Sequence, residues 1–367
     1  MYLVRQAGQA HGILGQILLI PAFCFPGQSP EKAGETIQKR QDTGAEGQKL
    51  PPLVLRLKRE MGYDRDMITE GKGLIDMNGA RKIYISMPDK VKEIIRTLRG
   101  AGFEAWAVGG CVRDSILGRE PGDWDITTSA LPEQTKELFS RTFDTGIQHG
   151  TVTVLLEGEG FEVTTYRIDG AYEDSRHPTE VTFTRNLRED LLRRDFTINA
   201  MAYSDEEGLV DIFGGLEDLE RGVIRCVGNA RERFREDALR ILRGVRFAAQ
   251  LGFELEEETR EGMRALAPTL QKISAERIQT ELLKILLSGR PDMLRTAWEL
   301  GITAWFLPEF DRIMATTQET PHHMYTVGEH TLHALLNVRP DKVLRLTMLF
   351  HDMGKPDLKT VDEEGTA

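Results

Sequence analysis

The sequence predicts an α+β protein in which a head with a mixed sheet and helices precedes an all-helical neck and body. Two observations predict this fold class. Over residues 87–208, short apolar segments typical of strands alternate with segments of helical spacing, and after residue 211 nearly all apolar residues recur at helical spacing. The 367 residues, 40% of them hydrophobic and 29% charged, suffice for two or three soluble domains with sizeable cores.

Residues 1–86 are predicted to form a poorly ordered N-terminal extension. Gln16 and Pro21 interrupt the apolar stretch at 13–25, so we do not expect a secretory signal. Residues 28–50 are rich in Gly, Gln, Glu and Lys, a composition typical of disorder. No stretch approaches the roughly 18 apolar residues of a membrane span, so we expect no membrane partner.

The head is predicted over residues 87–208. A helix at 89–102, with Gly102 as its stop, is predicted by four apolar residues at helical spacing: Val91, Ile94, Ile95 and Leu98. The other elements predicted here are strands at 104–108, 123–127, 151–156, 161–166 and 180–184, with 151–156 paired to 161–166, and a helix at 112–117.

A glycine turn followed by two acids is the most informative part of the head. Gly109 and Gly110 allow a backbone to approach phosphate oxygens closely, and Arg113 adds a fork of donors. Asp123 and Asp125, at i and i+2 on a predicted strand, point to one side and reach one divalent cation or a close pair. We predict that both are catalytic ligands of Mg²⁺ beside a nucleotide phosphate site. The alternative is a plain glycine turn followed by a surface acid pair.

Three further segments follow in the chain. They are Leu-Arg-Arg-Asp-Phe-Thr-Ile-Asn-Ala at 192–200, Asp-Ile-Phe-Gly-Gly at 211–215 and Glu-Asp-Ala-Leu-Arg-Ile-Leu-Arg at 236–243. With the glycine turn and the acid pair, they resemble in order and spacing the class II tRNA nucleotidyltransferase and bacterial poly(A) polymerase family. The resemblance covers roughly residues 87–310. It implies Mg²⁺-dependent, template-free addition of nucleotides to an RNA 3′ end, most often C-C-A on tRNA from CTP and ATP, with no DNA partner. A-only or poly(A) addition is the alternative.

The resemblance also implies roles for single residues of the head. Arg194 is expected on the triphosphate, with Arg193 or Asp195 ordering the head, and the alternative is a structural Arg–Asp network at a helix end. A third carboxylate is expected on a neighbouring strand, where Glu162 fits by position. The polar stretch at 172–178 resembles the loop that family members need to add the terminal A.

The segment at 236–243 is predicted to lie on a helix around residues 234–249. Its apolar stripe consists of Phe234, Ala238, Ile241, Leu242, Val245 and Ala249. Asp237 and Arg240, at i and i+3, are neighbours on another face. A carboxylate accepts from an exocyclic amine and a guanidinium donates to a ring nitrogen, so this pair matches cytosine and adenine and opposes uracil and guanine. We predict that the pair reads the base, and a surface ion pair is the alternative. Arg243 and Arg246 are predicted to reach nucleotide phosphates or to be solvated.

The helical part is predicted to contain a neck at 209–272 and a body at 273–320. The helix around 275–284 resembles the one that supports the neck in this family.

Residues 321–367 are predicted to be the start of an HD domain that is truncated. Gly-Glu-His-Thr-Leu at 328–332 and Phe-His-Asp-Met-Gly-Lys at 350–355 resemble the opening of an HD-type phosphohydrolase domain. His330, His351 and Asp352 suit a transition metal or Mn²⁺. A metal-dependent phosphohydrolase with an RNA-binding head is therefore the alternative from another functional class.

Charge and cysteine content restrict the partners and the compartment. The formal net charge is −11, and residues 185–246 contain twelve Arg, no Lys and thirteen acids, so an RNA track depends on side-chain arrangement rather than on bulk charge. Cys24, Cys111 and Cys226 are odd in number and widely spaced, which argues against a disulfide scaffold or a Cys-ligated zinc. A reducing compartment, the cytoplasm, is predicted.

Overall fold

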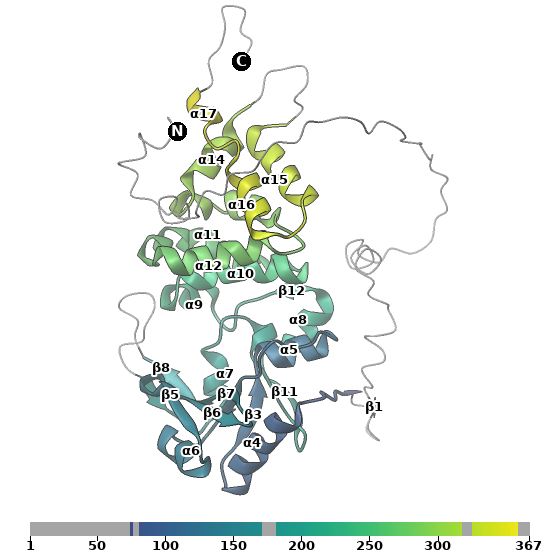
Figure 1. The fold of residues 1–367 in the computed structure, drawn as a ribbon, viewed down its shortest axis with the longest axis vertical. Helices are drawn as coiled ribbons and strands as arrows, with labels where there is room; N and C mark the ends of the chain where they lie inside the picture. The colour runs from purple at the N-terminus through teal and green to yellow at the C-terminus, as the bar shows by residue number, and fades with distance from the viewer. Residues whose placement is uncertain (1–73, 76–80, 171–180, 318–324, 359–367) are drawn as a thin grey trace, which may run out of the picture. The chain divides into compact units, whose positions relative to one another are not determined.

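The computed structural model describes residues 74–75, 81–170, 181–317 and 325–358 (Figure 1). The predicted extension lies almost wholly outside these residues, as does the loop at 172–178. The first described strands, β1 (Leu74–Ile75) and β2 (Arg81–Lys82), pair antiparallel. Among the described residues, no helix has the length and apolar character needed to cross a membrane.

The head is built on a mixed sheet of seven strands in the order β11-β10-β3-β4-β7-β6-β5 (Figure 1). The strands are β3 (Ala105–Val108), β4 (Ile126–Thr128), β5 (Thr142–Gly146), β6 (Thr151–Leu156), β7 (Glu159–Thr165), β10 (Met201–Ser204) and β11 (Gly208–Asp211). β4 and β7 are parallel, whereas the other neighbours are antiparallel. β8 (Arg167–Asp169) and β9 (Val181–Phe183) form a separate antiparallel pair. The mixed sheet confirms the predicted fold class.

The strand predictions differ from the structure at three places. The predicted pair at 151–156 and 161–166 is confirmed as β6 and β7, but β5, β8, β10 and β11 were not predicted. The strand predicted at 123–127 begins only at Ile126. β11 ends at Asp211, so the sheet of the head continues past the predicted boundary at residue 208.

Short helices cover the sheet. They are α4 (Asp89–Gly100), α5 (Gly110–Ile116), α6 (Pro132–Leu138), α7 (Leu187–Leu192) and the 3-10 turns η1 (Ile147–His149) and η2 (Thr197–Asn199). The four apolar residues predicted to face the core from the first helix are each at most 1% exposed, which confirms that helix. Trp106, Tyr166 and Leu191 belong to a core cluster that joins α7 to the sheet.

Beyond the sheet, the described residues are helical apart from one short parallel pair of strands, β12 (Val223–Ile224) and β13 (Glu254–Leu255). The elements of this part include α8 (Gly215–Arg221), α9 (Ala230–Glu236), α10 (Leu239–Leu251), α11 (Glu257–Leu266), η3 (Ala267–Lys272), α12 (Ala275–Leu286), α13 (Met293–Glu299) and η4 (Thr303–Trp305). The last ones described are α14 (Pro308–Ala315), α15 (Val327–Asn337), α16 (Lys342–Phe350) and α17 (Lys355–Leu358). Cys111 and Cys226 are free and buried.

The prediction of a single helix around 234–249 is wrong, because the helix is interrupted at Asp237, between α9 and α10. Asp237 has an extended backbone, with φ −137° and ψ 106°. Its Oδ1 accepts from the backbone N–H of Leu239 at 2.9 Å, so the side chain caps the start of α10. All six residues of the predicted apolar stripe are nevertheless buried, at most 2% exposed.

Candidate active site

Strand β3 ends in a glycine turn that lies beside two arginines. Gly109 has φ +84° and ψ −129°, a conformation that L side chains rarely adopt. A Cβ there would lie 3.3 Å from Nη1 of Arg194, and a Cβ at Gly110 would lie 3.7 Å from Nη2 of Arg113. The lack of a side chain at Gly109 therefore leaves room for the Arg194 guanidinium against the backbone, whereas the distance at Gly110 is an ordinary van der Waals contact. Helix α5 begins at Gly110, two residues before its predicted start.

Asp123 and Asp125 lie just before β4 and not on it, which corrects the predicted strand. The backbone N–H of Val108 donates to the carbonyl of Asp125 at 3.0 Å, so Asp125 lies next to the end of β3 and the glycine turn. β4 runs parallel to β7 in a register that brings Asp125 level with Glu162. The acids before β4 and an acid of β7 therefore lie on the side of the sheet's end where the glycine turn begins.

These three carboxylates act on one another. Burial raises the pKa of Asp125, and the charges of Asp123 and Glu162 raise it further, whereas Arg194 lowers it. Asp123 and Glu162 are exposed. In the part of the chain that the structure describes, none of the three forms an ion pair. Hard divalent cations take carboxylate oxygens as ligands, so these acids suit such a cation by chemical type. Their ligand atoms do not all lie within 4.8 Å of one another in this structure.

Arg194 is held in place by Asp190, a fully buried acid on α7. Nη2 of Arg194 donates to Oδ2 of Asp190 at 3.2 Å, and Nε and Nη2 of Arg193 donate to Oδ1 at 3.0 and 2.7 Å. Burial raises the pKa of Asp190, but the two arginines outweigh burial and the net shift is downward. Both interpretations of this segment therefore have support: an Arg–Asp network exists at the helix end, and it leaves Arg194 against the glycine turn.

Arg113 is bound to the head itself. Its Nε and Nη2 donate to the two oxygens of Asp114 at 2.9 and 2.8 Å, and its Nη1 donates to Oδ1 of Asn199 at 2.6 Å. The guanidinium also lies 5.1 Å from the centre of the Phe247 ring. Arg113, Asp114 and Phe247 line a cavity of about 320 Å³. The three guanidinium nitrogens of Arg113, which the sequence analysis assigned to phosphate, thus donate to protein acceptors in this structure.

Asp195 and Arg243 join the head to the neck. Nε of Arg243 donates to Oδ2 of Asp195 at 2.8 Å, and Nη2 lies 2.6 Å from the same oxygen. Burial raises the pKa of Asp195, but Arg243 outweighs burial and the net shift is downward. Arg246 pairs with Glu281 of α12, with Nε and Oε2 2.6 Å apart. Neither Arg243 nor Arg246 is simply solvated, since each holds a buried acid.

Asp237 and Arg240 are held by different partners. Oδ2 of Asp237 accepts from Nη2 of Arg277 at 2.9 Å. Nη1 of Arg240 donates to Glu236 at 2.5 Å, and Nη2 donates to the carbonyl of Arg193 at 2.9 Å. Because the helix breaks at Asp237, these two residues do not share a helical face as predicted. They still lie in one turn, in which the backbone N–H of Arg240 donates to the carbonyl of Asp237 at 3.0 Å.

A second cluster of metal-ligand type lies among the last described helices. His330, His351 and Asp352 offer ligand atoms that lie within 4.8 Å of one another, the only such group of three His, Cys, Asp or Glu residues among those described. Nδ1 of His351 lies 2.7 Å from the carbonyl of Met348, which orients Nε2 toward Asp352 at 3.2 Å. Nζ of Lys355 also lies 2.8 Å from Asp352, so a lysine competes for this carboxylate.

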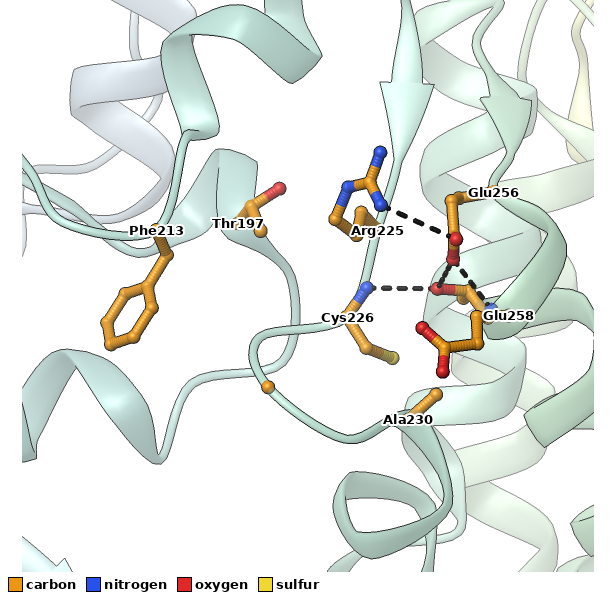
Figure 2. Close-up of a pocket in the computed structure, with 9 residues that line it drawn as sticks. Thr197, Phe213, Arg225, Cys226, Ala230, Glu256 and Glu258 are labelled. Atoms are coloured by element: carbon orange, nitrogen blue, oxygen red, sulfur yellow. Dashed lines mark hydrogen bonds and ion pairs between the residues drawn. The ribbon is translucent and has the colours of Figure 1, made fainter.

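A cavity of about 210 Å³ lies between β12 and α11, away from the predicted site residues (Figure 2). Arg225 and Glu256 point toward one another across it, with Nη1 and Oε1 3.4 Å apart. The backbone N–H of Cys226 donates to Oγ1 of Thr259 at 3.1 Å. Polar groups lining this cavity are thus engaged with one another, and their contacts tie the strand to the helix.

Sequence reasoning missed Asp190, Asn199, Arg277 and Glu281 as members of the site's supporting network. A signal existed for Asp190, since the acid precedes Arg193 and Arg194 by three and four residues, the spacing of helical neighbours. Arg113 and Arg246, the site arginines that meet Asn199 and Glu281, lie far away in the chain, and spacing gives no sign of these contacts.

Two protein families match consecutive parts of the chain. The family described as "Poly A polymerase head domain" matches residues 105–225, and the family described as "Probable RNA and SrmB- binding site of polymerase A" matches residues 252–314. A CCA-adding enzyme of Lactiplantibacillus plantarum is 53% identical over 200 residues, which are 54% of this chain and 49% of that protein. One of Enterococcus faecalis is 52% identical over 205 residues, 55% of this chain and 50% of that protein. The chain thus spans about half the length of these curated relatives.

Solved structures extend the likeness. The Bacillus stearothermophilus CCA-adding enzyme in complex with CTP is 36% identical, with a TM-score of 0.57, over 74% of this chain and 69% of that one. A Thermotoga maritima CCA-adding enzyme complexed with tRNA is 23% identical, with a TM-score of 0.54, over 76% of this chain and 63% of that one, and this likeness concerns the fold alone.

Proposed function

The chain belongs to the family of CCA-adding enzymes, and on that premise we propose that it adds C and A to the 3′ end of tRNA from CTP and ATP. In the proposed reaction, the RNA 3′ hydroxyl attacks the α-phosphorus of the nucleotide and pyrophosphate leaves. The reaction draws on nucleoside triphosphates of the cytoplasm, which is the proposed location. The observation that carries the proposal is the convergence of Asp125, the glycine turn and Arg194 at the end of β3.

The head provides the proposed transfer site. Asp123 and Asp125 are the proposed Mg²⁺ ligands, and Glu162 is proposed as a third, because the charges of Asp123 and Glu162 already disfavour ionisation of Asp125. The chemistry supplied by the cation when bound is stabilisation of charge on the attacking and leaving oxygens. Gly109 allows the triphosphate to approach the backbone, and Arg194 is proposed to bind its oxygens.

Asp237 and Arg240 are proposed to select the base. The exocyclic amine of cytosine or adenine donates to Asp237 and shares this carboxylate with Arg277, while Arg240 donates to the ring nitrogen. Uracil and guanine present a carbonyl and a ring N–H at these positions, so both contacts are lost. Arg113, Arg243 and Arg246 are proposed to support the nucleotide site from within the protein, because their guanidiniums bind Asn199, Asp195 and Glu281.

The proposal is tested with purified protein, Mg²⁺ and both CTP and ATP offered to three tRNAs. One lacks its last three nucleotides, one lacks only the terminal A, and one is complete. We expect two C and one A on the first, one A on the second and nothing on the third. Long A tracts on every substrate would identify a poly(A) polymerase instead, and no addition by the wild type would contradict the proposal.

A second metal site is proposed at His330, His351 and Asp352. The observation that favours it is the orientation of His351, whose Nδ1 faces a backbone carbonyl and whose Nε2 faces Asp352. Imidazole and carboxylate ligands suit Mn²⁺ and later transition metals. Since Lys355 shares Asp352, we expect weak binding and little phosphohydrolase activity.

Calorimetric titration with Mn²⁺ and Ni²⁺ tests this second site. His351→Ala should remove transition-metal binding and leave nucleotide addition unchanged. Robust hydrolysis of 2′,3′-cyclic phosphates that is lost in His351→Ala would instead support the phosphohydrolase alternative.

A further inference from the structure

We infer that Asp190 is a positioning residue that fixes Arg194 for the triphosphate, an inference that rests on the proposed function. Asp190 is fully buried, so it does not itself meet a substrate, and as an anion it would repel a phosphate. Whatever Asp190 contributes to nucleotide binding must therefore pass through the groups that it holds.

The carboxylate of Asp190 connects β4, the strand that follows the proposed metal ligands, to Arg194 at the glycine turn. Its Oδ2 accepts from Oγ1 of Thr127, two residues after Asp125, at 3.1 Å. The same Oδ2 accepts from Nη2 of Arg194 at 3.2 Å. One oxygen atom thus joins β4 to Arg194, and this fixes the distance between the acids that precede β4 and the guanidinium.

The other oxygen of Asp190 extends this connection toward the base reader. Oδ1 accepts from Nε and Nη2 of Arg193 at 3.0 and 2.7 Å, and the carbonyl of Arg193 in turn accepts from Nη2 of Arg240 at 2.9 Å. Asp190 also separates two adjacent cations, since Arg193 and Arg194 would repel one another without the charge between them. Removing that charge should release Arg194 from the glycine turn.

The geometry of Arg194 shows which of its atoms remain for a ligand. Nη2 donates to Asp190. Nη1 lies next to the backbone of Gly109, because a Cβ built on that glycine would be 3.3 Å from it. Nε is buried and has no hydrogen-bond partner among the described residues. Asp190 therefore holds the guanidinium of Arg194 through Nη2, while Nη1 faces the glycine turn at which the phosphates are proposed to bind.

A double-mutant cycle on Asp190 and Arg194 tests the inference, with inorganic tripolyphosphate and Mg²⁺ as the probe in a calorimetric titration without RNA. Asp190→Asn should weaken tripolyphosphate binding roughly tenfold, the loss expected when a charged hydrogen bond no longer orients its donor. In an Arg194→Ala background, Asp190→Asn should cause no further loss. Equal weakening with and without Arg194, or unchanged binding in Asp190→Asn, would overturn the inference.

Asp218→Asn provides a matched control for damage to the fold. Asp218 is also buried, accepts from Oγ1 of Thr197 at 2.6 Å and pairs with Arg225. Both partners line the cavity of Figure 2 and neither is a candidate site residue. This variant should lower the unfolding temperature and leave tripolyphosphate affinity unchanged. Equal loss of affinity in Asp218→Asn would show that the effect of Asp190→Asn is general destabilisation.

Three further outcomes remain decisive. If Asp190→Asn does not fold, Asp190→Glu keeps the charge but moves the carboxylate by one methylene, and it should still weaken tripolyphosphate binding through Arg194 alone; wild-type affinity in this variant would overturn the inference. A wild type that binds tripolyphosphate but adds nothing to tRNA contradicts the proposed function and leaves the role of Asp190 standing. A wild type that does not bind tripolyphosphate overturns the role of Asp190.

Discussion

The acids near the glycine turn of the head and the arginines of α10 in the neck differ in how their charges are compensated. Asp123, Asp125 and Glu162 form no ion pair among the described residues. The pKa of Asp125 is raised by burial and further by the charges of Asp123 and Glu162. In α10, each of the three arginines is joined to an acid: Arg240 to Glu236, Arg243 to Asp195 and Arg246 to Glu281.

The head carboxylates are thus available to a ligand, whereas the charges of the neck ion pairs stabilise the fold. Uncompensated carboxylates are costly in the free protein and become favourable when a cation binds. Buried ion pairs are already compensated, and breaking one leaves a charge without a partner. Substitutions at Asp123, Asp125 or Glu162 should therefore remove function with little loss of stability, whereas substitutions at the ion pairs of α10 should first cost stability.

The largest expected effect is on catalysis. Asp125→Asn should lower nucleotide addition by about 10³-fold or more, since loss of metal-stabilised charge costs several kcal/mol. The raised pKa of Asp125 means that its ionised form destabilises the fold as pH rises above its ordinary value. At neutral pH without metal, the unfolding temperature of Asp125→Asn should therefore equal or exceed that of the wild type. Near-normal addition by this variant would contradict the metal assignment.

The next effect is on stability. Arg243→Ala leaves Asp195 buried without its cation and should cost about 2–4 kcal/mol, toward the lower end because Arg243 is partly exposed. The lowered pKa of Asp195 means that the pair contributes stability above the unfolded value of about 4, and this stability is lost as pH falls below it. Chemical denaturation at neutral and acidic pH should show a large difference between wild type and variant at neutral pH that shrinks in acid. A constant difference would indicate that the pair contributes little.

A smaller effect is expected on base choice. Asp237→Ala or Arg240→Ala should relax discrimination against UTP and GTP about tenfold, because one good base contact is worth about 1–3 kcal/mol. Single-turnover addition of each of the four nucleotides measures this preference. An unchanged preference for C and A in both variants would mean that Asp237 and Arg240 only stabilise the fold, through their contacts with Arg277 and Glu236.

The smallest effect is expected at an exposed ion pair. Arg221 and Glu217 lie one helical turn apart, with side chains 58% and 72% exposed. Arg221→Ala should change the free energy of unfolding by less than about 0.5 kcal/mol. A loss as large as that of Arg243→Ala would contradict the distinction drawn between buried and exposed pairs.

Local patterns in the sequence predicted some of the individual elements. Helix α4 follows from four apolar residues at helical spacing, and the pair β6 and β7 follows from strand-like composition. The interruption of the helix at Asp237 could also have been predicted from the sequence, because Asp is a preferred residue at the start of a helix. Here its side chain accepts from the backbone N–H of Leu239. The apolar stripe hid this signal, since burial continues across the break.

Contacts between distant parts of the chain could not be predicted from spacing. Arg113 meets Asn199 across 86 residues, and Arg243 meets Asp195 across 48. Nothing periodic links such positions, so the sequence identified the arginines but not their acceptors. The site residues came from resemblance and residue chemistry, whereas the network that holds them became visible only in the structure.

Calorimetric titration with Mg²⁺ tests most directly the claim that the head carboxylates form a cation site. Wild type should bind Mg²⁺, Asp125→Asn should lose this binding, and His351→Ala, which alters the other candidate metal cluster, should retain it. Equal Mg²⁺ binding by wild type and Asp125→Asn, or its loss in His351→Ala alone, would contradict the assignment of the site to the head.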